Sequence, residues 1–330
     1  MKKNDKKNKK KISYKKKKHI KKKMENHKFT ETKKVITIPK MMDSFLTSKT
    51  YMIIMDFIRI LQRSCTGKKK SDVPLSKNEC ILGFLKLFEE LDKIILEAPL
   101  SHKEQRFGNT GFKIFRKLIE ERYETLIEII LKPKLNKELM KELKNYFLES
   151  FGSNMRLDYG TGHELNFLCL LFCLYQCNYY KEEDFDSLIV HIFFKYLLFV
   201  RKIQVTYLLE PAGAHGVWGL DEYQFLPFLF GAGQLINNTD NILPKDIHND
   251  NILNQYYEEY MYLSCIKHIK SVKHGASFGE YAPMLDSISA VPIWDKVAKG
   301  LVKMYEDEVL KKFVVMQHFY FGSILTYPSI

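Results

Sequence analysis

The fold class is decided by residues 76–95, SKNECILGFLKLFEELDKII, which carry one complete helical pattern. The first four residues form a Ser-x-x-Glu capping box, a common start of a helix. The apolar positions that follow recur every three or four residues, so a helix gathers them on one face. They are Ile81, Phe84, Leu85, Phe88, Leu91 and Ile95. Pro99 ends the pattern, because proline lacks the backbone N–H that a helix needs.

The same spacing recurs on both sides of this stretch. It predicts helices over residues 52–61, 112–130, 137–151, 163–178, 185–203 and 253–271, and one that starts at Pro292. The only strand-like alternation is Val35–Pro39, which is too short for a sheet. No repeat period is present. The sequence therefore predicts an all-α fold.

The charge of the chain is concentrated in one segment. Of the net charge of +13, all comes from residues 1–23, which hold fourteen Lys and one Asp; the other residues carry 38 basic and 38 acidic side chains. We expect residues 1–33 to form a disordered Lys-rich arm and residues 34–330 to form the folded domain. The arm is either solvated sequence or a contact for nucleic acid or an importin. The domain itself gives no electrostatic reason to expect nucleic-acid binding.

Targeting and cysteine patterns point to a reducing compartment without a membrane span. No apolar region follows the Lys-rich start, so no signal peptide is expected. The most apolar run, Leu165–Tyr175, is shorter than the roughly 18 to 20 residues that cross a bilayer. Six cysteines show no disulfide spacing. Cys169, Cys173 and Cys177 would share one helical face, as small core residues or, less simply, as metal ligands.

Residues 209–235, LEPAGAHGVWGLDEYQFLPFLFGAGQL, have the composition of a recognition surface. Glycines allow close backbone approach or positive φ, and Trp218 with the phenylalanines offers large, stiff contact area. Asp221 and Glu222 are candidate ligands for a hard cation, although capping or solvation is the commoner role of such acids.

A second loop, Arg156–Glu164 (RLDYGTGHE), places glycines and a threonine before an apolar helix. Free N–H groups at a helix N-terminus suit a phosphate, so the loop is either a phosphate site or an ordinary helix-entry turn. It lacks the Gly-Lys-Ser/Thr element of a P-loop. No hydrolase elbow, zinc-protease motif or kinase motif set is present.

Several stretches together resemble the phosphotyrosyl phosphatase activator family, the activators of protein phosphatase 2A. The matching segments are RFGN (106–109), RLDYGTGHE (156–164), EPAG (210–213), GVWGLDEYQFLPF (216–228), ISAVP (288–292) with Trp294, and QHF (317–319) with FGS (321–323). They cover residues 34–330 in the family's order. The resemblance implies a helical fold of core, lid and linker. It also implies binding of the phosphatase 2A catalytic subunit (with its scaffold subunit), binding of ATP and Mg²⁺, and peptidyl-prolyl cis-trans isomerase activity.

The resemblance also assigns residues to these activities. ATP contacts would come from Arg156, Thr161, Gly162, Val314, Gln317 and His318. Gly216 and Glu222 would lie near Mg²⁺, although relatives usually have Asp-Asp at positions 221 and 222. Val291, Gly300 and Met304 would contact the phosphatase.

Prolyl isomerisation needs no nucleophile, because a groove that binds the twisted amide best lowers the rotation barrier by itself. We expect Trp218 and Phe225 to line such a groove and to hold a proline-containing peptide. An alternative is a non-catalytic assembly factor in which isomerase turnover is incidental; a free-standing ATPase lacks a water-activating residue. The expected location is the cytoplasm, with the nucleus as an alternative.

Overall fold

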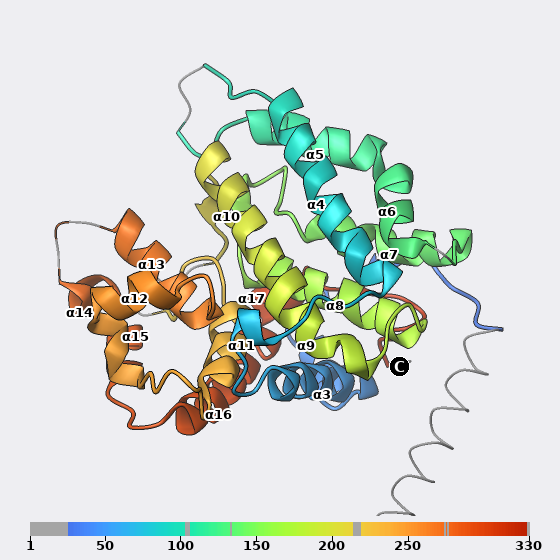
Figure 1. The fold of residues 1–330 in the computed structure, drawn as a ribbon. Helices are drawn as coiled ribbons and strands as arrows, with labels where there is room; N and C mark the ends of the chain where they lie inside the picture. Colours follow the sequence, from blue (N-terminus) through green and yellow to red (C-terminus); the bar gives the residue numbers. More distant parts are fainter. Residues whose placement is uncertain are drawn as a thin grey trace, which may run out of the picture.

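The computed structural model describes residues 26–102, 106–132, 134–213, 219–273, 275 and 277–328. Helices dominate these residues, and the strands in them form two short pairs, which confirms the all-α fold. Figure 1 shows one group of helices around α4, α5, α6 and α7, and a second group formed by α12 to α15, with α10 and α11 between them. Within the described residues, no helix is both long and apolar enough to cross a membrane.

The helix predicted from residues 76–95 is α4 (Glu79–Glu97), and its start differs from the prediction. Asn78 caps it, because the Asn78 side chain accepts from the backbone N–H groups of Cys80 and Ile81. Ser76 lies outside the helix, where its hydroxyl donates to Asp184 at 2.6 Å. The capping residue was therefore misplaced by two positions, since tertiary contacts hold Ser76 elsewhere.

Two predicted long helices are each broken into two. Residues 112–130 form α5 (Gly111–Glu121) and α6 (Tyr123–Leu131), and residues 253–271 form α12 (Asp250–Tyr256) and α13 (Met261–Val272). The first break, at Arg122, lets α6 lie against α4. The contact is very close, since a Cβ added at Gly83 would lie 2.6 Å from the Ile129 carbonyl oxygen.

The centre of the fold is built on α8 (Thr161–Gln176), of which twelve consecutive residues, His163 to Leu174, are buried. It packs against α7 (Lys137–Glu149). The next segment, predicted as one helix, runs through α9 (Phe185–Ser187), a π-helical turn (Leu188–Phe193) and α10 (Phe194–Tyr207). On α8, Cys169 and Cys173 are buried and burial raises the pKa of both thiols, which supports their interpretation as core residues.

The C-terminal half packs on α11 (Leu226–Leu235), which contacts both α13 and α16 (Trp294–Tyr305). Gly231 permits this, because a Cβ there would lie 2.2 Å from the Tyr262 backbone nitrogen. The helix predicted from Pro292 begins two residues later, at Trp294. The remaining helices are α2 (Met41–Leu46), α3 (Lys49–Ser64), α14 (Phe278–Tyr281), α15 (Pro283–Ser289) and α17 (Phe313–Met316), with a π turn (Glu306–Leu310) and three short 3₁₀ turns (Lys70–Asp72, Glu182–Asp184, Pro244–His248).

The residues just before the predicted domain boundary contact the domain. Strand β1 (Lys33–Lys34) pairs antiparallel with β4 (Tyr320–Phe321). The buried carboxylate of Glu142 accepts from the Thr30 backbone N–H at 3.1 Å and from the Ile324 backbone N–H at 2.7 Å. Residues 26–33, which the sequence analysis assigned to the arm, therefore lie against the domain, beside its C-terminal segment. Residues 1–25 lie outside the described residues.

Candidate functional site

The loop at residues 153–160 is fixed by backbone contacts on two sides. Strand β2 (Asp158–Tyr159) pairs in parallel with β3 (Glu210–Pro211). The loop therefore lies beside the start of residues 209–235, the glycine-rich stretch that we call the central stretch. Gly160 is needed for this approach, because a Cβ there would come within 2.9 Å of the Ala212 Cβ and carbonyl oxygen. The structure therefore brings together two of the segments that the sequence analysis singled out.

Helix α8 begins directly after this loop, and no side chain of the described residues caps its first turn. In contrast, α3, α4 and α7 are capped by Ser48, Asn78 and Asn136. Thr161 and Gly162, at the start of α8, are half-buried residues, and the helix dipole is positive there. This end of α8 has the chemistry to accept an anion.

The Gln317–His318 segment lies against the same helix end. Helix α17 packs on α8, and a Cβ at Gly162 would lie 3.5 Å from the Val315 side chain. Burial lowers the pKa of His318, the charges of Arg156 and Lys34 lower it further, and the charge of Asp158 opposes them. The predicted ATP-contacting residues 156, 161, 162 and 318 thus lie near one another at the start of α8. Gln317 donates to the Val314 carbonyl at 3.3 Å, and the Val314 side chain is 61% exposed.

The predicted cation position is only partly described. Gly216 lies outside the described residues. The Glu222 carboxylate forms an ion pair with Lys273 at 2.9 Å, and Lys273 also donates to the Tyr281 carbonyl at 3.4 Å. Among the described residues, no three His, Cys, Asp or Glu side chains group to hold a metal. A carboxylate suits Mg²⁺ by type, but Mg²⁺ at Glu222 would have to displace the Lys273 ammonium.

Of the two residues expected to line an isomerase groove, one is buried and one is undescribed. The Phe225 side chain is 4% exposed and packs edge-on against Tyr305 with ring centroids 5.3 Å apart. It belongs to the core beside α16, which corrects the expectation of an open aromatic wall. Trp218 lies outside the described residues.

Glu164 is a buried acid whose contacts the sequence analysis did not anticipate. One carboxylate oxygen accepts from the backbone N–H groups of Phe225 (3.1 Å) and Leu226 (2.8 Å), at the start of α11. Among the described residues, the other oxygen has no hydrogen-bond partner. Burial raises the pKa of Glu164 to about 8; the two N–H groups oppose this shift, and the charge of Asp221 adds to it. In the motif RLDYGTGHE, the only sign that Glu164 would be a buried acceptor was its position one turn into an apolar helix.

Comparisons with known proteins agree on one family. Residues 32–327 match the model of the phosphotyrosyl phosphate activator (PTPA) protein family. The chain belongs to this family. It is 41% identical to "Serine/threonine-protein phosphatase 2A activator 2" of Candida albicans, over 91% of this chain and 83% of that protein. A "Probable serine/threonine-protein phosphatase 2A activator 2" of Dictyostelium discoideum is 44% identical over 86% of this chain, which spans 62% of that protein.

A solved structure supports the same assignment. The crystal structure of the PP2A phosphatase activator Ypa1 superimposes with a TM-score of 0.80 at 28% identity, covering 92% of this chain and 97% of that one. The PTPA family assignment therefore agrees with both sequence and fold. It was predicted from the ordered set of motifs.

The residues that the PTPA resemblance assigns to the phosphatase lie on or just before α16. Gly300 is exposed, and a Cβ there would meet no atom within 4 Å. Met304 lies one helical turn later and is half-buried, as is Val291 before the helix. Trp294 anchors the start of α16, since its indole N–H donates to the Ile242 carbonyl at 2.9 Å. The three residues therefore sit on a firmly held element, and a side chain at position 300 would point into open space.

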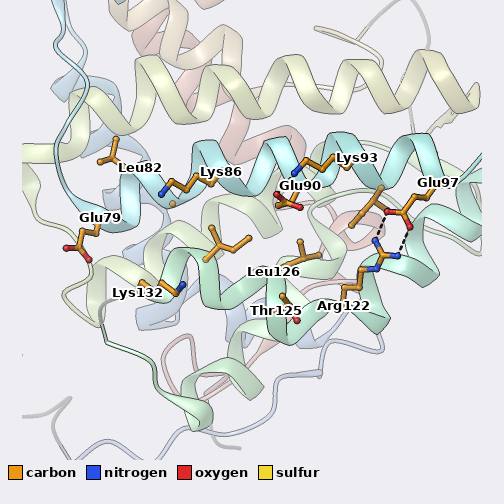
Figure 2. A pocket seen from close by; sticks show the side chains of 13 residues that line it. Glu79, Leu82, Lys86, Glu90, Lys93, Glu97, Arg122, Thr125, Leu126 and Lys132 are labelled. Carbon is orange, nitrogen blue, oxygen red and sulfur yellow. Dashed lines mark hydrogen bonds and ion pairs between the residues drawn. The ribbon is translucent and has the colours of Figure 1, made fainter.

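One hollow among the described residues lies away from these motifs. Figure 2 shows it between α4 and α6, with a volume of about 610 Å³. Charges of both signs line it, and Arg122 binds Glu97 through two hydrogen bonds of 2.8 and 2.5 Å. Its acids and bases largely neutralise one another. None of the predicted site residues lines it, so size alone does not mark the functional site of this PTPA protein.

Proposed function

We propose that this protein activates serine/threonine protein phosphatase 2A by binding the catalytic subunit together with ATP and Mg²⁺. The names of its PTPA relatives support the phosphatase as the partner. The observation that carries the nucleotide part is the uncapped start of α8 facing the Gln317–His318 segment. There the charges of Arg156 and Lys34 act on His318, and a bound anion would interact favourably with them.

In this proposal the phosphates of ATP lie at the start of α8. The N–H of Gly162 and the hydroxyl of Thr161 donate to them, and Arg156 supplies a charged, planar donor pair. Gln317 and His318 contact the nucleotide from the other side, and Val314 offers an apolar surface. Glu222 is the carboxylate that would hold Mg²⁺, and it would have to leave Lys273 to do so.

The proposed enzymatic activity is peptidyl-prolyl cis-trans isomerisation. Rotation about the peptide bond faces a barrier of roughly 18–20 kcal/mol, which a groove lowers by binding the twisted amide best. Trp218 remains the proposed wall of that groove. Because Phe225 is buried, its side chain contributes only if α11 and α16 separate. This burial favours the second candidate, a non-catalytic assembly factor that reshapes the phosphatase.

The decisive experiment is a pull-down of the phosphatase 2A catalytic subunit with the full chain, with and without Mg-ATP. Binding that Mg-ATP strengthens supports the proposal, and absence of binding in both conditions contradicts it.

Gly300→Asp then tests the docking face, with Gly300→Ala as the matched control, because both side chains enter open space. We expect Asp to abolish binding and Ala to retain it. Isomerisation of a free proline peptide separates the two candidates. Turnover that Trp218→Ala abolishes supports the isomerase, whereas full phosphatase activation without any turnover supports the assembly factor.

A further inference from the structure

A line of alternating charges runs from the interior to the loop before α8. It begins at Arg116 on α5, which is 6% exposed and lies 3.8 Å from the Glu149 carboxylate. Glu149, at the end of α7, also lies beside His163: the Nδ1 atom of His163 is 2.6 Å from the Glu149 carbonyl oxygen. The line continues through Asp158 and ends at Arg156. Four separate elements thus converge on one arginine.

His163 is oriented by its contact with Glu149. A carbonyl oxygen only accepts hydrogen bonds, so Nδ1 of His163 carries a proton and donates it. This contact turns the other ring nitrogen, Nε2, toward Asp158, 3.6 Å from Oδ1. The ring is buried and tilted against Tyr159, with centroids 5.6 Å apart. His163 therefore forms a fixed wall behind the Asp158 carboxylate.

Asp158 in turn holds Arg156. Asp158 is 7% exposed and lies on β2, so its carboxylate has little freedom. Its Oδ2 accepts from the Nε atom of Arg156 at 2.6 Å. Leu157, between the two residues, has a φ of +52°. This conformation is unusual for leucine and is maintained by the surrounding contacts.

The hydrogen bond to Asp158 leaves the two terminal guanidinium nitrogens of Arg156 available. Only Nε is used by Asp158, and among the described residues neither terminal guanidinium nitrogen has a protein partner. Those two nitrogens form the planar fork that binds phosphate in a bidentate way. The positive charge of Arg156 already reaches His318, whose pKa it helps to lower. The fork is thus held near the corner assigned to phosphate.

We propose that Asp158, backed by His163, is the positioning residue for Arg156 in phosphate recognition. This inference rests on the proposed nucleotide binding. A held arginine loses less side-chain freedom on binding, which is worth about 3- to 10-fold in affinity. The negative charge of Asp158 also has an opposing effect, because it repels phosphate and so weakens binding. Whether removal of this charge weakens or tightens phosphate binding therefore tests the proposal.

The test is a double-mutant cycle measured by isothermal titration calorimetry on the full chain. The variants are Arg156→Met, Asp158→Asn and the double variant, and the probes are ATP, adenosine and sodium tripolyphosphate. We expect Asp158→Asn to weaken ATP and tripolyphosphate binding about 3- to 10-fold and to leave adenosine unchanged. In the Arg156→Met background it has no further effect, because Asp158 acts through Arg156.

Three results would overturn the inference: tighter ATP binding by Asp158→Asn, an equal loss in both backgrounds, or an equal loss for adenosine. His163→Asn is a control for a folding artefact. The asparagine amide retains a donor near the Glu149 carbonyl, and the substitution removes only the ring that packs behind the Asp158 carboxylate. It should weaken ATP binding less than Asp158→Asn does. If wild type binds tripolyphosphate but not ATP, the nucleotide proposal fails while the positioning role is still measured. If wild type binds neither, both fail.

Discussion

Replacing Glu164 by glutamine should make the protein less sensitive to rising pH. The Glu164 carboxyl is fully buried, and one oxygen accepts from the backbone N–H groups of Phe225 and Leu226. A glutamine carbonyl accepts the same two hydrogen bonds. Its amide group then occupies the place of the oxygen that has no partner. The substitution therefore keeps the anchor of α11 and removes only the ionisation.

The size and sign follow from the pKa of Glu164, which burial raises from its ordinary value of 4.5 to about 8. Between these two values the folded state binds more protons than the unfolded state, so the free energy of unfolding falls as pH rises. A shift of about 3.5 units at 1.36 kcal/mol each gives about 5 kcal/mol, reached only above pH 8. We regard this as an upper limit, because local water entry would lower it.

The assay is urea unfolding of wild type and Glu164→Gln at pH 5, 6, 7 and 8, with an exposed acid, Glu89→Gln, as the control. The variant should differ little from wild type at pH 5 and be more stable by several kcal/mol at pH 8. The control should show no such trend. Equal pH dependence of wild type and Glu164→Gln would refute the reasoning, because it would mean that Glu164 is ionised in the folded protein.

Further predictions concern the same region. Gly160→Ala should destabilise the protein by about 1–3 kcal/mol in urea unfolding, because its Cβ collides with the turn after β3, whereas Gly162→Ala should be tolerated. Lys273→Met should free Glu222 and lower the Mg²⁺ concentration that half-saturates ATP binding in calorimetry; an unchanged concentration would place the ion elsewhere. Burial, with the charge of Arg201, lowers the pKa of His268 to about 4. Wild type should therefore lose stability as pH falls from about 6.5 to 4, because the unfolded state binds the proton more readily. His268→Gln should lose less stability over this range, as measured by thermal melting.

Helical periodicity predicted most of the helices and the fold class, because a buried face needs apolar residues at a fixed spacing. It could not predict where those helices break. Arg122 falls within a run whose spacing continues smoothly on both sides, and its break follows from the contact of α6 with α4 at Gly83. The predicted start of α4 was wrong for the same reason, since a tertiary hydrogen bond to Asp184 holds Ser76 outside the helix.

The candidate site divides in the same way. The motif at 156–164 was singled out from residue types and the segment at 317–318 from the family resemblance, and the structure brings them together at the start of α8. The pairing of Glu222 with Lys273 and the burial of Phe225 were not predictable, because both depend on helices distant in sequence. Aromatic residues in a glycine-rich stretch fit a core as well as they fit a groove.

Strand β3 and the start of α11 are both attached to one short segment of the chain. Glu210 and Ala212 donate backbone N–H groups to the carbonyls of Leu157 (2.9 Å) and Tyr159 (2.8 Å). The start of α11 is held by Glu164. Both anchors therefore lie within residues 157–164, the segment proposed to receive phosphate. We expect a ligand that shifts this segment to shift β3 and the start of α11 as well, and through α11 to affect α16, the proposed docking face for the phosphatase. We therefore predict that nucleotide binding and partner docking are coupled.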